Sequence, residues 1–251
     1  MTAPVFLAGD GQLAGPARSG SGTVVLEGPE GRHAVSVRRL RPGEEIVLTD
    51  GAGTGAWGTV ESASGKDRLE VTVTSVRTEA EPQPRITVVQ ALPKGDRGEL
   101  AVETLTETGA DAIVPWAASR CVTQWKGERG QKSLAKWRST AREAGKQARR
   151  LRFPQVAGLA TTAQVAQLLR GADLGVVLHE EGDSSLATAE LPTDGGIVLV
   201  VGPEGGVSPQ ELTAFAEAGA QPFRLGPTVL RTSTAGTAAT ALLLGRMGRW
   251  S

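Results

Sequence analysis

The chain has 251 residues, more than the roughly 100 to 200 residues of one typical domain, so its length favours two domains. Hydrophobic residues make up 39% and charged residues 22%, and no apolar run approaches the roughly 18 residues that cross a bilayer, which excludes a helical membrane protein. One cysteine and two histidines exclude an internal disulfide and a clustered zinc site, so we expect no metal. The first residues lack the pattern of a secretory signal, which predicts a cytoplasmic protein.

The first part of the chain contains short β-like runs separated by glycine-rich turns. A helix-like stretch, residues 31–43, interrupts these runs and ends at Pro42 and Gly43. The pattern predicts a small β-barrel over residues 1–76, followed by a polar linker with two prolines over residues 77–84. The β-like runs lie at residues 23–28, 44–51, 56–62 and 68–76.

From residue 85 onward the pattern changes, because continuous apolar runs alternate with helix-like segments. Such runs are typical of strands buried on both faces of a parallel sheet. We therefore predict an α/β domain over residues 85–251, with a loop over residues 182–196. The predicted strands lie at residues 86–93, 111–116, 174–179 and 196–202, and the predicted helices lie at residues 97–110, 161–172 and 208–220.

A glycine-rich turn joins the strand at 196–202 to the helix that follows. The helix start is well specified, since Ser208 as N-cap, Pro209 as first residue and Glu211 as third form a capping box. Glycines at 202, 205 and 206 permit positive φ and close approach of the backbone at the carboxyl end of the strand. Ligands bind at that end of open α/β sheets; the alternative is a strand-to-helix turn that holds nothing.

A second loop repeats this arrangement before the last helix. It carries Arg231 and the hydroxyl groups of Thr228, Thr232, Ser233 and Thr234, and the two loops are able to form one pocket. The alternative is that Arg231 is a surface charge and the hydroxyls only cap the helix. Neither loop has the Lys-Ser/Thr pair of a P-loop, and no G-x-G-x-x-G opens a helix, which argues against a nucleoside triphosphatase and a Rossmann site.

Residues 129–152 carry nine basic side chains and one acidic side chain, Glu143. The basic side chains of such a helix repel one another unless an anion lies nearby. This excess of positive charge favours contact with nucleic acid over a helix face that is only solvated. Trp137 either stacks on a base or anchors the helix to the core through its spacing with Leu134 and Ala141.

Taken together, these motifs resemble the ribosomal RNA small subunit methyltransferase E family, the uridine N3-methyltransferases of the knotted SPOUT class. The most specific matches are GPEGG at residues 202–206, followed by Glu211, and LGPTVLRTSTA at residues 225–235; further matches are HAVSVRRLRPG, LPKGDR, ETGADAIVPWAASRCV and EAGKQARR. The resemblance covers nearly the whole chain. One departure is Ser233, which stands where the family usually has a glutamate.

The resemblance implies a PUA-like N-terminal barrel that helps to bind RNA and a knotted C-terminal domain that binds S-adenosylmethionine and forms a homodimer. The implied cofactor residues are Leu178, His179, Val201, Gly202, Pro203, Gly205, Gly206, Leu225, Gly226, Leu230, Thr232, Ser233 and Thr234. The implied RNA-binding residues are His33, Arg38, Arg39, Lys94, Arg120, Arg142, Gln147, Arg149 and Arg150. For His33 the alternative is a surface histidine that makes no contact with RNA. The implied partner is small-subunit ribosomal RNA in an assembled or partly assembled subunit.

For this reaction we expect Arg231 to stabilise charge on a uracil carbonyl oxygen and Glu204 to orient or deprotonate the base. Glu204 has an equal alternative, in which it caps amides of its own turn. Two other functions stay open at this point: a non-catalytic RNA-binding or ribosome-assembly protein, and a SPOUT methyltransferase that acts on a ribose 2′-hydroxyl or another base.

Overall fold

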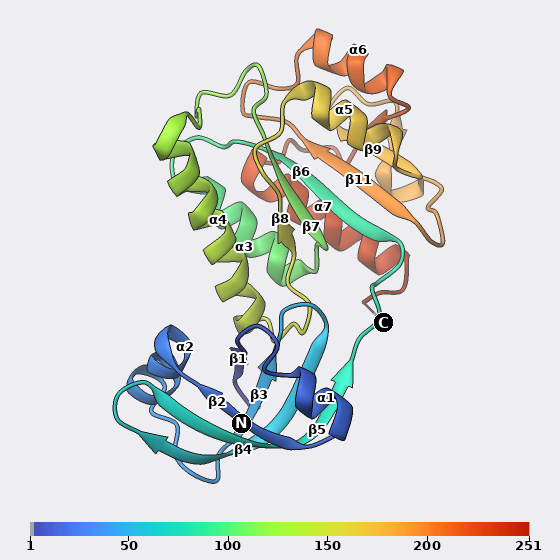
Figure 1. Cartoon of the computed structure of the whole chain (residues 1–251). Coiled ribbons are helices and arrows are strands. Elements are labelled where there is room, and N and C mark those ends of the chain that lie inside the picture. The colour runs from blue at the N-terminus through green and yellow to red at the C-terminus, as the bar shows by residue number, and fades with distance from the viewer. Residues whose placement is uncertain (1–2, 251) are drawn as a thin grey trace. The chain divides into compact units, whose positions relative to one another are not determined.

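The computed structural model describes residues 3–250 and shows two compact units (Figure 1). Unit 1 contains the described residues up to Glu81 together with Gly145–Phe153, and unit 2 contains Pro82–Ala144 and the described residues from Pro154 onward. Each unit encloses its own apolar core. No helix formed by residues 3–250 has the length and apolar character needed to cross a membrane.

Unit 1 is built on a five-stranded sheet with the order β1-β3-β4-β5-β2. β1 pairs with β3 in parallel, and all other neighbours are antiparallel. Gly58 lies at a register shift between β4 and β5, where a Cβ atom at this position would come within 2.3 Å of the Thr72 carbonyl oxygen, so only glycine fits. The strands are β1 (Val5–Leu7), β2 (Gly22–Leu26), β3 (Glu45–Thr49), β4 (Thr54–Ser64) and β5 (Arg68–Thr78).

All four β-like runs predicted in this part of the chain lie in strands, whereas β1 and the short helix α1 (Ala14–Ser19) were not predicted. The predicted helical interruption consists of α2 (Gly28–Arg32) and a π-helical turn, His33–Val37. Arg39 follows with a φ of 55°, the left-handed region that non-glycine residues rarely adopt. The segment is therefore an irregular turn rather than a regular helix.

Unit 1 also includes the end of the basic stretch. Helix α4 (Gly127–Gln147) ends before Arg152, so our predicted basic helix is too long. The following residues pack on the sheet: Leu151 lies in a small apolar cluster, and its carbonyl oxygen accepts a hydrogen bond from the Thr49 hydroxyl at 2.8 Å. Lys146 is 6% exposed and its Nζ lies 2.7 Å from Glu30 Oε1, so this basic side chain is part of a buried ion pair.

Unit 2 is built on a seven-stranded sheet with the order β10-β12-β9-β11-β6-β7-β8, in which every neighbouring pair is parallel. This confirms the predicted α/β domain with a parallel sheet. Its strands are β6 (Arg85–Ala91), β7 (Ala112–Trp116), β8 (Gln155–Val156), β9 (Leu174–Leu178), β10 (Ser184–Ser185), β11 (Gly196–Val201) and β12 (Gln221–Arg224).

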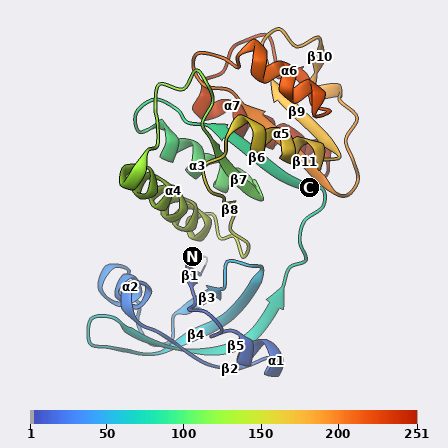
Figure 2. The ribbon, with the colours of Figure 1, turned by 45° about the horizontal axis from the view of Figure 1, so that its top comes forward.

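Helices cover both faces of this sheet (Figure 2). Successive residues of β11 enter different cores: Ile197 and Leu199 pack with α3, α4 and α7, whereas Val198 and Val200 pack with α5 and α6. This double burial explains why the central strands are continuously apolar. The remaining helices are α3 (Arg97–Thr108), α5 (Thr162–Arg170), α6 (Pro209–Glu217) and α7 (Thr232–Arg246), and a 3-10 turn spans Leu186–Thr188.

Two tryptophans fix α4 against this sheet. Trp137 is 2% exposed and its ring meets Trp125 edge to face at 4.9 Å. A Cβ atom at Gly98 of α3 would come within 2.8 Å of the Trp137 ring, so the two helices approach closely at this glycine. Trp137 is thus a core anchor, and the alternative of base stacking is wrong.

Candidate functional site

A pocket of ≈ 1100 Å³ opens at the carboxyl ends of β9, β11 and β12 in unit 2. Three segments surround it: the chain after β9, the glycine loop (residues 202–207) after β11, and the α7-entry loop (residues 225–231) after β12. Parallel strands that end side by side bring these loops together, which is where open α/β sheets bind ligands. The two loops singled out in the sequence therefore do form one pocket.

The glycine loop is a tight turn before a capped helix. Gly206 has a φ of 74° and its amide donates to the Pro203 carbonyl oxygen at 2.9 Å. A Cβ atom at Gly202 would come within 2.8 Å of Val207 Cγ2, so a side chain there would displace the turn. The predicted capping box is confirmed, since the Ser208 hydroxyl accepts from the Glu211 amide and the Glu211 carboxylate accepts from the Ser208 amide.

The α7-entry loop presents Arg231 as the N-cap residue of α7. Its carbonyl oxygen accepts from the amides of Thr234 and Ala235, both at 2.9 Å, and its exposed side chain lines the pocket. Beneath it, the buried side chain of Gln90 donates from Nε2 to the Thr232 carbonyl oxygen at 3.2 Å. The end of β6 thus anchors the loop that carries Arg231.

Glu204 is an exposed residue of the glycine loop, and it also lines the pocket. Its Oε1 accepts a hydrogen bond from the Lys94 amide at 3.1 Å. The carboxylate therefore holds the segment after β6, instead of capping amides of its own turn as the alternative in the sequence analysis had it. A carboxylate on the pocket wall, held by a backbone amide, is placed to accept a hydrogen bond or a proton from a ligand.

The pocket wall carries both basic and acidic side chains. The basic ones are Arg97 of α3, Arg120 after β7, Arg224 at the end of β12 and Arg231 of the α7-entry loop. Glu180 and Glu181 line the pocket from the chain after β9, where His179 Nδ1 accepts from the Glu181 amide at 3.2 Å.

The structure places the predicted cofactor residues around this pocket, apart from two. Ser233, 4% exposed, and Thr234 lie in the first turn of α7 and do not line it. The residues that line the pocket without having been predicted are Arg97, Glu180, Glu181, Ser185, Val207, Phe223, Arg224, Pro227, Val229 and Ala235. Val207 lies inside the glycine loop, and Glu180 and Glu181 directly follow His179, so these positions were close to the predicted ones. Arg97 depends on which strand ends are neighbours in the sheet.

The predicted RNA-binding residues are spread over both units. Arg120 lines the pocket, Lys94 contacts Glu204 through its amide, and Arg142 is exposed on α4. In unit 1, the half-buried His33 ring packs edge to face on Phe6 at 5.4 Å, and the left-handed turn at Arg149 has a φ of 56°. The other members in unit 1 are Arg38, Arg39, Gln147 and Arg150.

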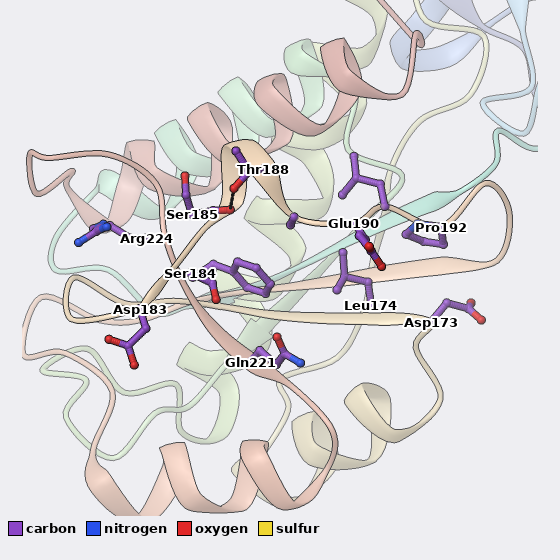
Figure 3. Close-up of a pocket in the computed structure, with 13 residues that line it drawn as sticks. Asp173, Leu174, Asp183, Ser184, Ser185, Thr188, Glu190, Pro192, Gln221 and Arg224 are labelled. Atoms are coloured by element: carbon purple, nitrogen blue, oxygen red, sulfur yellow. Dashed lines mark hydrogen bonds between the residues drawn. The ribbon is translucent and has the colours of Figure 1, made fainter.

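A second pocket of ≈ 850 Å³ lies at the β10 edge of the same sheet (Figure 3). It reaches Asp173 and Gln221, at the amino-terminal ends of β9 and β12, and it has no glycine turn. Its acidic groups are Asp173, Asp183 and Glu190. No group of three or more His, Cys, Asp or Glu side chains able to hold a metal occurs within residues 3–250. The pocket at the carboxyl ends of the strands, which contains the glycine loop, is the candidate site.

Comparisons with known families agree with this two-part architecture. Residues 79–244 match the family model described as RNA methyltransferase domain, and residues 26–74 match the RNA methyltransferase PUA domain. Among curated proteins, the chain is 47% identical over 235 residues to the ribosomal RNA small subunit methyltransferase E of Mycobacterium bovis, which covers 90% of this chain and 87% of the relative.

Solved structures agree as well. The ribosomal RNA small subunit methyltransferase E of Neisseria gonorrhoeae, bound to S-adenosylmethionine, superimposes with a TM-score of 0.84 at 30% identity and covers 98% of both chains. A putative methyltransferase of Legionella pneumophila, in complex with S-adenosylmethionine, gives a TM-score of 0.84 at 25% identity, again over 98% of both chains. The chain belongs to the ribosomal RNA small subunit methyltransferase E family.

Proposed function

We propose that this protein transfers a methyl group from S-adenosylmethionine to N3 of a uridine in 16S ribosomal RNA. The observation that carries the proposal is a single pocket, at the carboxyl ends of the parallel strands, whose wall contains the glycine loop, Arg231 and Glu204. Membership of the methyltransferase E family supports the cofactor and the RNA class. The choice of uridine N3 rests on the resemblance of the loop motifs and on the chemistry of these two side chains.

The residues of the pocket fit S-adenosylmethionine. Small-molecule pockets usually measure about 300 to 1,000 Å³, so a pocket of ≈ 1100 Å³ is large enough for the cofactor. Leu178, Leu225 and Leu230 supply apolar walls. Within residues 3–250, the amides of Glu204 and Gly205 donate to no other group of the protein, so both are available to polar atoms of the cofactor.

The cofactor supplies an electrophilic methyl group, and the protein has to supply an anionic base in line with it. Uridine N3 carries a proton, which must leave before or as the N3 lone pair forms the new bond. Glu204 is the proposed acceptor of that proton. Arg231 stabilises the negative charge that develops on the uracil carbonyl oxygens, and the pocket walls hold N3 within about 3 to 3.5 Å of the methyl carbon.

Uridine N3 lies on the base-pairing edge, so the target has to be unpaired or flipped out of a helix. We propose that basic residues of both units, together with Gln147, bind the RNA around it, because phosphate contacts provide most of the affinity. The proposed set is His33, Arg38, Arg39, Lys94, Arg120, Arg142, Gln147, Arg149 and Arg150. Since ribosomal RNA is the substrate class, we place the reaction in the cytoplasm.

We also propose a homodimer that forms through the outer face of α7. Ala238 and Ala241 lie half-exposed on this helix, and small side chains allow close approach of a second helix. The chain passes from α6 on one face of the sheet to α7 on the other after β12; we propose that this passage is threaded as a trefoil knot. Light scattering coupled to gel filtration should give twice the mass of one chain, and a monomer at micromolar concentration would contradict the dimer.

A methyl-transfer assay with labelled S-adenosylmethionine tests the proposal against a non-catalytic RNA-binding protein. Label should enter small-subunit RNA or the small subunit, and large-subunit RNA should stay unlabelled. In parallel, S-adenosylmethionine at about 100 times its dissociation constant should stabilise the fold by roughly 2.7 kcal/mol. A melting temperature that does not respond to the cofactor, together with unlabelled RNA, would favour the binding protein.

A further inference from the structure

The carboxylate of Glu211 joins three separate segments of unit 2. Glu211 is 4% exposed. Its Oε2 accepts from the amide and the hydroxyl of Ser208, at 2.9 and 2.8 Å. Its Oε1 accepts from the Ser119 amide at 2.7 Å and from the Thr162 hydroxyl at 3.3 Å. The start of α6, the chain after β7 and the start of α5 thus meet at one side chain.

Only part of this arrangement is explained by helix capping. A capping box requires the reciprocal bonds between Ser208 and Glu211, and these use Oε2. The contacts of Oε1 reach Ser119 and Thr162, which lie outside the α6 turn. Burial raises the pKa of Glu211, but the hydrogen bonds from Ser119 and Ser208 outweigh it, and the pKa lies below its ordinary value. The side chain is therefore an ionised, buried acceptor.

The Ser119 contact leads to the pocket through the next residue. Arg120 donates from Nη1 to the Gly205 carbonyl oxygen at 3.0 Å. A Cβ atom at Gly205 would come within 3.1 Å of Arg120 Cβ, so the backbone of the glycine loop lies directly against this arginine. Arg120 directly follows Ser119, so the hydrogen bond to Glu211 lies one residue from the contact with the glycine loop.

We infer that Glu211 is a positioning residue of the pocket, which holds the Ser119–Arg120 backbone so that Arg120 keeps Gly205 in its ligand-binding conformation. The identity of the ligand as S-adenosylmethionine rests on the proposed function. Glu211 acts through Arg120 and does not line the pocket itself. Arg120 gains a structural role beside the RNA contact proposed for it.

Calorimetric titration with S-adenosylmethionine tests this inference. In Glu211→Gln the amide NH₂ cannot accept, so the amide of Ser119 or that of Ser208 loses its acceptor. We expect cofactor affinity to fall about tenfold, a coupling that hydrogen-bonded neighbours commonly show. Ser208→Ala is the matched control: it removes the capping hydroxyl, keeps Oε1 on Ser119 and Thr162, and should leave cofactor affinity within about twofold of wild type.

A double-mutant cycle separates positioning from general destabilisation. If Glu211 acts through Arg120, adding Glu211→Gln to Arg120→Ala should weaken cofactor binding no further than the more severe single variant does. Additive losses, or equal affinities in Glu211→Gln and Ser208→Ala, would overturn the inference. If Glu211→Gln does not fold, the Arg120→Ala variant is sufficient for the test, because an unchanged cofactor affinity in this variant would overturn the inference. A wild-type protein that does not bind the cofactor would instead refute the proposed function.

Discussion

Arg231 and Glu204 are the two side chains on which the proposed chemistry depends, and they differ in how the protein holds them. Arg231 projects from a helix N-cap whose backbone is anchored by α7 and Gln90. Glu204 is tied to the Lys94 amide, so it has to keep or exchange this partner when a base enters. Ser233, where the family usually has a glutamate, is buried and does not line the pocket. Because this residue is a serine, the chain has no carboxylate at this position to act as a base.

The first prediction concerns Arg231→Ala. Removal of the guanidinium should lower methyl transfer by about 10²- to 10³-fold, the usual effect of losing one group that stabilises developing charge. Cofactor affinity should stay within a few-fold of wild type, because the loop backbone is held by other contacts. Single-turnover transfer and calorimetric titration measure the two effects, with Ser208→Ala as the control. Undiminished transfer would refute the role of Arg231.

The second prediction concerns the pH dependence of stability at Glu211. Because its pKa lies below the ordinary value in the folded protein, its carboxylate stabilises the fold above the pKa of the unfolded chain, about 4.3. That stabilisation is lost as pH falls through the lower folded pKa. We expect wild type to have a higher free energy of unfolding than Glu211→Gln. Measured in urea, this difference should be complete at pH 6 and should become smaller toward pH 3. A difference in the free energy of unfolding that increases on acidification would contradict the prediction.

At the scale of elements, the glycine loop could be predicted from the sequence more readily than the pocket residues that other segments contribute. The glycine loop and its capping box could be inferred because they depend on residues within one turn of each other, Ser208, Pro209 and Glu211. Arg97 could not be assigned to the pocket, because that requires knowing that β6 lies next to β11. The second role of Glu211 was hidden for the same reason, since Ser119 is 92 residues away.

The third prediction concerns the start of α6. Ser208→Ala removes the hydroxyl that accepts from the Glu211 amide, and N-cap losses of this kind typically cost about 1 kcal/mol. We expect a loss of that size in the free energy of unfolding, measured in urea, with methyl transfer and cofactor binding retained. Selective loss of cofactor binding at unchanged stability would show that Ser208 contacts the cofactor instead.

At the scale of the whole molecule, sequence pattern predicts two domain types correctly and misses one connection. The change from short β-like runs to alternating apolar runs and helices matches the two sheets. The segment Gly145–Phe153 belongs to unit 1 although it follows α4 in the chain, and no local pattern shows this because its contact from Leu151 to Thr49 spans 102 residues. In the sequence, the buried Lys146 cannot be distinguished from an exposed lysine that binds RNA, because both add to the basic character of residues 129–152.

The fourth prediction concerns RNA affinity. If about five phosphates are contacted by the basic residues, the affinity for single-stranded RNA should fall with salt at a log-log slope of roughly −3.5. Fluorescence anisotropy with a labelled RNA measures this slope, over a salt range of roughly 50 to 300 mM. Arg142→Ala, on the exposed side of α4, should make the slope shallower by about 0.7. Binding that is insensitive to salt would remove the RNA interpretation of these residues.

The most direct test of the central claim is nucleoside mass spectrometry of small-subunit RNA after incubation with the protein and isotope-labelled S-adenosylmethionine. Digestion to nucleosides identifies the atom that receives the methyl group, because 3-methyluridine, 2′-O-methyluridine and methylated cytidines separate and fragment differently. Our account predicts labelled 3-methyluridine, present with wild type and nearly absent with Arg231→Ala. Label in a 2′-O-methylated nucleoside or in another base would contradict it.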